Sequence, residues 1–520
     1  MNMTAGLRFG SWIRVLAGIG GGVALAAMAS CAGATYHSKD PVADIKNKDL
    51  QLNQREIALD ELWQDTKDGK TEPGVTRETL KDLIWKGGAP APLRQKALAL
   101  LLSDTTPEAI ADTRHLLLLR LPTEGSWPMV VDICEAIQKR AADPAWRDQT
   151  ASLVRSYARK VPIPPDPDRP ERGALMALYP DRTLDQIVLD VFIDPRANGA
   201  PERPDDSASK ASASAWDLLA RLDPDGSKRT ELIAARGTVD PALAPIARAA
   251  KELGVVPVTG AELTWVKRLL DDKDARSAAW WAEASAAVQR LTPSQRQGLQ
   301  LRHIEPVRWA AAHRTEWLSA EREDLYNQLQ SRLSGRVIHR KFDSGEPVSG
   351  KMASKETAKE WKDSLVYGDL LAIMVIDEAV HQPGVMGEFF KQATEDRADT
   401  STEYGGVLWA TDMYLQPKTQ EAFLVRGYQP RPTQRVNDRT FIAPEEMFVD
   451  SGRSLAHYHF HVQTDNNAEY AGPGKGDLEY AATNGRSCVV LTSVRAGVMD
   501  VDYYQRGGVI VDLGEIVAGR

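Results

Sequence analysis

The stretch that decides the fold is LAHYHFHVQTDNNAEYAGPGKGDL, Leu455–Leu478, in which three of the chain's nine histidines stand at alternate positions. Alternate residues of a β-strand point to the same face, so the stretch predicts a strand that presents His457, His459 and His461 together. A neutral imidazole is the commonest protein ligand for a metal ion, and two of these rings can converge on one cation. The glycines that follow let the backbone turn Asp477 back toward the strand, where its carboxylate would add a further ligand. We therefore predict a metal site built on this strand.

The sequence around this strand combines helical and strand patterns. SLVYGDLLAIMVIDEAVHQ predicts a helix, and the runs EYGGVLWA, EAFLVRGY, SCVVLTSV, VDYYQ and GGVIVDLG are rich in β-branched and aromatic residues, as strands are. The run DYYQRGGVIVDLG is typical of a terminal hairpin. We therefore predict an α+β domain with a mixed sheet over residues 350–520.

The N-terminal half of the chain is predicted to be all-α. Residues 76–194 and 216–335 carry apolar residues at helical spacing, and several prolines fall near expected helix starts. The first region has the rhythm of HEAT or armadillo repeats but no repeat of fixed length, and an irregular helical bundle fits as well. Residues 195–215 are rich in Pro, Ser, Ala and Asp, which is typical of a solvated linker. The tryptophans of the second region are predicted to be core residues: Trp265, Trp280, Trp281, Trp309 and Trp317.

The beginning of the chain resembles a bacterial lipoprotein signal. A positive start and the small, apolar run Val15–Ala27 lead to residues 28–30 and then to Cys31, the residue that such signals lipidate. The resemblance implies that residues 1–30 are a signal peptide and that the polar residues 31–75 tether the folded body to a lipid. It also implies a location at the bacterial cell envelope, on the periplasmic or extracytoplasmic face, and an ordinary signal peptide or membrane anchor would also place the body outside the cytoplasm. No other stretch is long and apolar enough to span a bilayer.

Composition excludes several classes of function. The chain of 520 residues has a net charge of -8 and no strongly basic stretch, so nucleic acid is not an expected partner. Cys134 and Cys488 lie in segments that we expect to fold apart, and both are predicted to be buried thiols. The sequence has no Gly-x-Ser-x-Gly motif, P-loop or Rossmann fingerprint, so serine-hydrolase and nucleotide-binding readings are not supported.

The order of these motifs resembles the JAMM (MPN-plus) metalloproteases. His-x-His on a strand, a loop and then Asp before LEYAA matches the zinc motif of that family, and STEYGGVLWA supplies the upstream Glu in an equivalent context. The resemblance implies that His459, His461 and Asp477 bind Zn²⁺ and leave the fourth position to water. It also implies that Glu403 takes a proton from this water and passes it to the leaving amine as a peptide or isopeptide bond is cleaved.

Two features depart from the family pattern. Val462 follows the second His where the family usually has Pro, and the gap to Asp477 is longer. Gly474 stands where the family places a Ser that stabilises the developing oxyanion, a loss that can reduce turnover by about 10²- to 10³-fold. Asn466, Asn467 or a backbone N–H of the Gly-rich turn are candidate substitutes.

The residues leave three readings open. The first is a lipid-anchored zinc hydrolase whose helical half binds a protein partner or positions a peptide or protein substrate. The second is a JAMM-like domain without catalysis that serves as a scaffold or binding lipoprotein. The third is a cupin-like site that uses all three histidines, against which the predicted flanking helices argue. In the first reading His457 is either an outer-shell group or a half-buried strand residue, and we favour the half-buried residue.

Overall fold

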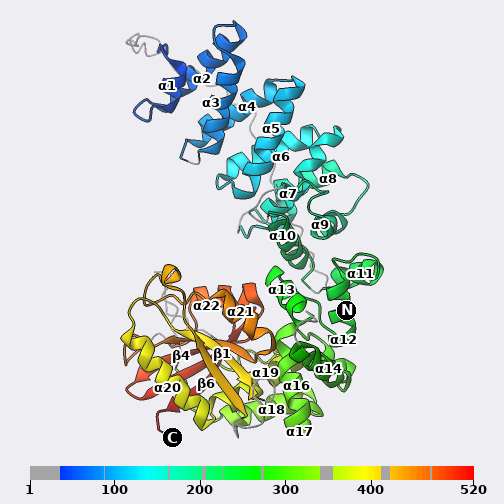
Figure 1. Ribbon diagram of the computed structural model, residues 1–520, viewed down its shortest axis with the longest axis vertical. Coiled ribbons are helices and arrows are strands. Elements are labelled where there is room, and N and C mark those ends of the chain that lie inside the picture. Colours follow the sequence, from blue (N-terminus) through cyan, green and yellow to red (C-terminus); the bar gives the residue numbers. More distant parts are fainter. Residues whose placement is uncertain are drawn as a thin grey trace, which may run out of the picture. The chain divides into compact units, whose positions relative to one another are not determined.

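The computed structural model describes residues 36–86, 88–161, 164–201, 207–224, 226–270, 275–339, 355–411, 422–468 and 471–519 (Figure 1). The predicted signal peptide and Cys31 lie outside these residues. The chain divides into two compact units, one ending at Leu100 and one beginning at Leu101. Among the described residues, no helix combines the length and the apolar character that crossing a membrane requires.

The first unit is helical where a tether was predicted. Its helices are α1 (Pro41–Lys46), α2 (Leu52–Lys67), α3 (Pro73–Trp85) and most of α4 (Ala91–Ser103). Ile45, Leu59 and Leu62 are buried, and the guanidinium of buried Arg55 donates to the carbonyl of Ile45 at 2.9 Å. The prediction of a solvated tether over residues 36–75 is therefore wrong, because a few well-spaced apolar residues are enough to pack short helices together.

The second unit begins with a long series of helices. They are α5 (Pro107–Arg120), α6 (Trp127–Lys139), α7 (Thr150–Ala158), α8 (Pro170–Leu178), α9 (Leu184–Ile193), α10 (Ser207–Leu222), α11 (Ser227–Arg236), α12 (Ala244–Leu253), α13 (Gly260–Leu269), α14 (Ala275–Gln289), α15 (Pro293–Arg296), α16 (Ile304–His313), α17 (Thr315–Leu318) and α18 (Arg322–Leu333). Short 3₁₀ turns lie at Leu121–Thr123, Pro144–Gln149, Asp166–Asp168 and Leu301–His303. The all-α character of this part of the chain is as predicted, and the starts of α5 and α6 carry prolines within their first two residues, where a missing N–H costs little.

The predicted linker over residues 195–215 is partly helix. Residues 207–215 form the first half of α10, whose Ala211 and Ala215 are buried. The ring of Trp216 lies 4.9 Å from that of Phe192 on α9, so the two helices pack directly. Ser and Ala in this segment serve close helix packing rather than solvation, while residues 202–206 lie outside the described part of the chain.

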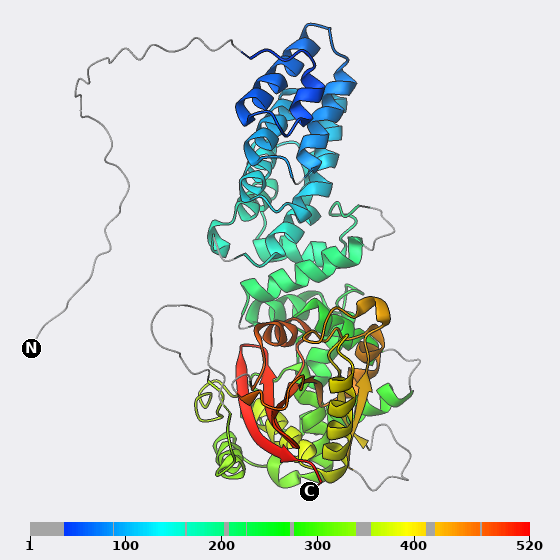
Figure 2. The ribbon, with the colours of Figure 1, turned by 90° about the vertical axis from the view of Figure 1, so that its left-hand side faces the viewer.

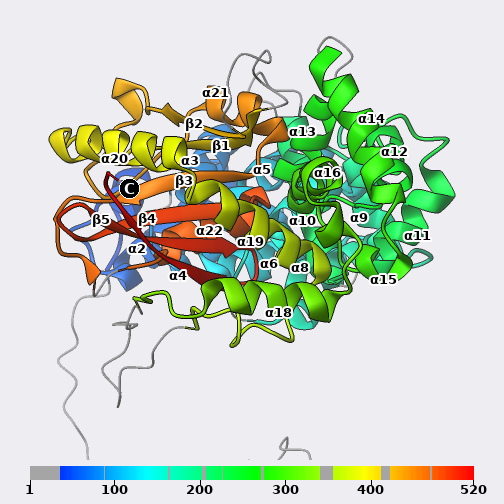
Figure 3. The same ribbon diagram turned by 90° about the horizontal axis from the view of Figure 1, so that it is seen from below.

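A mixed sheet of six strands closes the chain, as predicted (Figure 3). The strands are β1 (Gly405–Ala410), β2 (Phe423–Tyr428), β3 (Ala456–His461), β4 (Cys488–Arg495), β5 (Val498–Gln505) and β6 (Val509–Val517), in the order β2-β1-β3-β4-β5-β6. The pair β3–β4 is parallel and the other pairs are antiparallel. Gly507 and Gly508 take φ of 88° and 73°, the left-handed conformation that the tight β5–β6 turn requires, so the predicted terminal hairpin is confirmed.

Helices cover both faces of the sheet. These helices are α19 (Tyr367–Val380), α20 (Pro383–Ala398), α21 (Glu445–Asp450) and α22 (Lys475–Asn484), with 3₁₀ turns at Pro432–Gln434 and Ser451–Arg453. One face packs on α16, α19 and α20, and the other packs on α21 and α22. The histidine strand lies between β1 and β4, and its histidine face is on the side covered by α21 and α22, where the ring of His457 contacts Phe448 and Tyr480.

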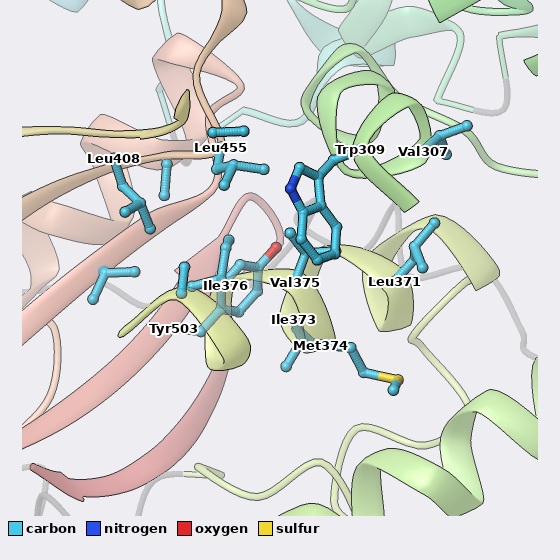
Figure 4. Close-up of a cluster of buried hydrophobic side chains, with 14 of the residues drawn as sticks. Val307, Trp309, Leu371, Ile373, Met374, Val375, Ile376, Leu408, Leu455 and Tyr503 are labelled. Atoms are coloured by element: carbon cyan, nitrogen blue, oxygen red, sulfur yellow. The ribbon is translucent and has the colours of Figure 1, made fainter. Parts of the chain in front are cut away.

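The helices before the sheet share its hydrophobic core. Trp309 of α16, Val375 of α19 and Leu408 of β1 belong to one buried cluster (Figure 4), and Figure 2 shows the green helices beside the yellow-to-red part of the chain. The domain boundary predicted near residues 335–350 therefore does not divide the core. The predicted core tryptophans are all buried, and Cys134 and Cys488 are buried free thiols.

Candidate metal centre

Strand register brings the first two partners of the site together. Gly405 of β1 is paired antiparallel with His459 of β3, and the N–H of Phe460 donates to the carbonyl of Tyr404 at 3.2 Å. Continuing this register by two residues sets Glu403 beside His461. Glu403 thus lies two residues before the start of β1 instead of within it, and its side chain is almost fully buried.

The third partner arrives on α22, in the crossover between the parallel strands β3 and β4. Asp477 lies in the first turn of α22, and one of its carboxylate oxygens, Oδ2, accepts the backbone N–H of Gly474 at 2.6 Å. A carboxylate is favoured at a helix N-terminus, where backbone N–H groups lack helical partners. The predicted helix after the Gly-rich loop is therefore present, with Asp477 inside its first turn.

The polar atoms of the predicted ligands converge. Nε2 of His459 lies 3.2 Å from Nε2 of His461 and 3.3 Å from Oδ1 of Asp477. Nε2 of His461 lies 3.6 Å from Oδ2 of Asp477 and 3.9 Å from Oε1 of Glu403. Glu403, His459 and His461 form one of the two groups of described residues that are placed to hold a metal ion.

The charges of these groups are strongly coupled. Burial acts to lower the pKa of His459, but neighbouring Asp477 outweighs it and the pKa is raised to about 9. Burial acts to raise the pKa of Asp477, yet His459 and His461 hold it below its usual range. Burial raises the pKa of Glu403 to about 7, so its carboxylate can exchange a proton near neutral pH.

Two neighbouring residues, which the sequence did not reveal, orient the side chains of this cluster. The side-chain amide of Gln463 donates to Oε1 of Glu403 at 3.2 Å and to the carbonyl of Asp438 at 2.6 Å. The hydroxyl of Tyr504 lies 3.4 Å from Nδ1 of His459, on the side of the ring away from the cluster. Partners of this kind fix the orientation and the tautomer of a ligating side chain.

His457 shares the strand face but not the cluster. Its Nδ1 lies 2.7 Å from the hydroxyl of Tyr480, and its buried Nε2 has no hydrogen-bond partner among the described residues. Burial holds the pKa of His457 well below its usual value, so the ring is neutral. The ring is fully buried rather than half-buried as predicted.

A cavity of about 260 Å³ opens beside the cluster. Its lining includes Glu403, His459 and Asp477 together with His457, Tyr480, Tyr504, Arg439, Thr440 and Phe441. Gly474, Asn466 and Asn467 are not part of this lining. Asn467 is instead engaged by the hydroxyl of Thr464 and through its own N–H by the carbonyl of Ser493. Gly476 of the Gly-rich turn, the other predicted source of a donor, does line the cavity.

The fold and the site together define a helix-rich protein with a mixed α/β unit whose sheet carries a buried cluster of histidines and carboxylates able to hold a metal ion. The chain matches no protein-family model, no curated protein and no solved structure.

Proposed function

We propose that the protein is a zinc-dependent hydrolase of JAMM type that cleaves a peptide or isopeptide bond. The observation that carries the proposal is the convergence of His459, His461 and Asp477: Nε2 of His459 lies 3.2 Å from Nε2 of His461 and 3.3 Å from Oδ1 of Asp477. Four donors placed tetrahedrally at the usual zinc distances of about 2.0–2.1 Å lie roughly 3.3–3.4 Å from one another. The donor set therefore suits tetrahedral zinc with one position open.

Zinc held by these residues would supply Lewis-acid polarisation of a carbonyl and would lower the pKa of water from 15.7 to about 7. The chain's own contribution is proton transfer and orientation. Glu403 lies 3.9 Å from Nε2 of His461 and is held by Gln463, so its carboxylate is placed to take a proton beside the ligands and to return it to a leaving amine. The cavity beside it offers room for the groups flanking the scissile bond.

A second candidate, a JAMM-like scaffold without catalysis, is favoured by Gly474. This residue has no side-chain donor, and its N–H is committed to Asp477 at 2.6 Å. An oxyanion donor must therefore come from other residues that line the cavity, such as Tyr504, Thr440 or Arg439. Our proposal includes a lipid anchor at Cys31, a location at the bacterial cell envelope and a protein partner for the helical half.

The first test is the metal content of the purified protein, measured by elemental analysis beside His461→Ala and Asp477→Ala. Near-stoichiometric zinc that is lost in both variants would support the site, and a peptide and isopeptide library would then be screened for cleavage. Glu395→Gln, at an exposed position on α20, serves as the matched carboxylate control and should keep the zinc. A folded wild-type protein without zinc would exclude the hydrolase and leave the scaffold.

A further inference from the structure

A second cluster of carboxylates lies on the same sheet face, two strands away. Asp500 and Asp502 alternate on β5, and Asp512 of β6 is the register partner of Asp502. The exposed fractions of the three side chains are 0%, 0% and 2%, and each offers a carboxylate oxygen within 4.8 Å of the others. Three acidic groups are therefore packed together out of contact with solvent.

Among the described residues no other group donates a hydrogen bond to the carboxylates of Asp500 and Asp502, which can bond only to each other through a shared proton. The buried hydroxyl of Thr492, directly across from Asp500 on β4, has no hydrogen-bond partner among the same residues. Buried polar groups are nearly always bonded, because leaving them unpaired costs free energy. Four carboxylate oxygens and one hydroxyl oxygen on this face of the sheet therefore lack a partner from the surrounding residues.

Asp512 differs from the other two because the backbone holds it in place. Its oxygens accept the N–H groups of Gly514 at 2.6 Å and His339 at 2.8 Å. Its own N–H donates to the carbonyl of Glu356 at 2.8 Å, and the Glu356 side chain is fully buried nearby. This arrangement fixes one carboxylate rigidly at the edge of the cluster.

The nearest positive side chains are engaged elsewhere. Arg336 pairs with Asp377 and donates to the carbonyl of Leu513 at 2.6 Å. Nε2 of His339 lies 2.9 Å from Oε1 of Glu515. Burial, with the charge of Asp512 second, raises the pKa of Asp500.

We propose that Asp500, Asp502, Asp512 and the hydroxyl of Thr492 form a calcium site. The donor set consists of oxygen atoms alone, which hard cations prefer to the nitrogen ligands of the histidine cluster. Ca²⁺ accepts six to eight oxygens and bidentate carboxylates, which suits three carboxylates and a hydroxyl, whereas Mg²⁺ is usually held by one or two carboxylates and keeps several waters. The carboxylates contribute up to six oxygens, and the hydroxyl adds one.

This site is separate from the histidine cluster. Val490 of β4 is the register partner of both His459 and Asp502, and its fully buried side chain stands between these two residues. Thr492 holds the same place between His461 and Asp500, so the two sites are neighbours that share no ligand. Asp502 also lies close to the loop that leads to α22. A Cβ atom built on Gly472 of this loop would lie 3.6 Å from Oδ2 of Asp502. Calcium bound here would brace β5, β6 and that loop without sharing a ligand with the first site.

The test uses the full chain after treatment with EDTA, with Ca²⁺ and Mg²⁺ as the probes in calorimetric titration and thermal unfolding. We expect one Ca²⁺ to bind, to raise the unfolding temperature and to bind more tightly than Mg²⁺. Asp502→Asn and Asp512→Asn should each weaken Ca²⁺ binding by about tenfold or more, a change that titration resolves readily. Glu395→Gln removes an exposed carboxylate outside the cluster and should leave Ca²⁺ binding unchanged.

Outcomes at the two sites are distinguishable. His461→Ala, which removes a ligand of the first site, should still bind Ca²⁺. Loss of zinc without loss of Ca²⁺ would therefore contradict only the first site. Folded wild-type protein that binds no Ca²⁺ would overturn the proposal, and an Asp502→Asn variant more stable than that protein would then identify a proton-sharing cluster. Tighter binding of Mg²⁺ than of Ca²⁺, or Ca²⁺ binding unaffected by both Asn variants, would also overturn it.

Discussion

Asp477 and His459 face each other in the cavity, with Oδ1 of the first 3.3 Å from Nε2 of the second. The other oxygen of Asp477 is fixed by the N–H of Gly474. The orientation of this ligand therefore depends on one backbone donor in the preceding loop, and that donor can be removed without touching a ligand.

Replacing Gly474 with Pro should lower zinc affinity about 10- to 100-fold, the usual cost of losing an outer-shell partner. Gly474 has φ of -80°, which Pro adopts, so the main loss is the N–H donor. Gly474→Ala keeps the N–H and is the matched control, which should bind zinc as the wild type does. Competition with a zinc chelator measures both, and equal affinities would contradict the role given to this bond.

Exchange of Glu403 for Gln should separate metal binding from turnover. The amide has the shape of the carboxyl group but cannot take a proton, so hydrolysis should fall by about 10²- to 10⁴-fold while zinc content stays near that of the wild type. Zinc content and initial rates on a substrate found by library screening give the two readouts. Unchanged hydrolysis in this variant would remove Glu403 from the mechanism.

The buried ion network at the start of α19 predicts a dependence of stability on pH. Asp369 Oδ1 lies 2.9 Å from a guanidinium nitrogen of Arg302 and 2.8 Å from Nε2 of His303. Burial acts to raise the pKa of Asp369, but these two partners outweigh it and hold the pKa below its usual range. Because the folded pKa is the lower one, the stabilisation is present above pH of about 4 and is lost as pH falls below that value.

Asp369→Asn should therefore lower the free energy of unfolding at pH 7 by about 3–5 kcal/mol and flatten the loss of stability in acid. Asp324→Asn, at an exposed position in the first turn of α18, is the control and should change little. Thermal unfolding between pH 3 and pH 8 tests the prediction. An acid limb that is as steep in the Asp369 variant as in the wild type would contradict it.

Truncating Trp309 to Ala tests whether helices and sheet share one core. Its ring is buried and lies 5.1 Å from that of Phe423 on β2, so removing it should cost about 3–5 kcal/mol. Trp85→Ala, at an exposed position on α3, is the control. Denaturant unfolding followed by circular dichroism should show the loss in a single transition of the second unit, whereas loss of helix signal before strand signal would indicate separate cores.

Much of the sheet could be predicted because its sequence pattern is local. Runs of β-branched and aromatic residues mark the strands, and the spacing of His459 and His461 fixes their common face whatever the tertiary fold. The approach of Asp477 was predictable because glycines precede it and a helix follows. The place of Glu403 depends on the β1–β3 register, which the resemblance to a known motif suggested and which strand patterns alone do not determine.

Other features depend on contacts that sequence patterns do not show. In VMDVDYYQ the aspartates alternate as polar residues do on a solvated strand face, and only the covering loop at Gly472 and the segment around Glu356 bury them. Helix α20 has apolar residues too sparse to stand out, yet Phe389 packs on Tyr458 with ring centroids 5.0 Å apart. The polar composition of residues 36–75 likewise did not predict α1 and α2, whose apolar side chains are buried where the two helices pack on each other.

The crossover from β3 to β4 has a practical consequence for protein engineering. Both of its ends are pinned by the parallel register, with His461 paired to Thr492 and His457 to Cys488, so residues 463–487 enter and leave the sheet at fixed points. The two histidines belong to the permanent frame, while the third ligand travels with the inserted segment. Position 477 can therefore be given a different donor to change the metal preference, while Gln463, which holds Glu403, and Tyr480, which holds His457, are kept in the same segment.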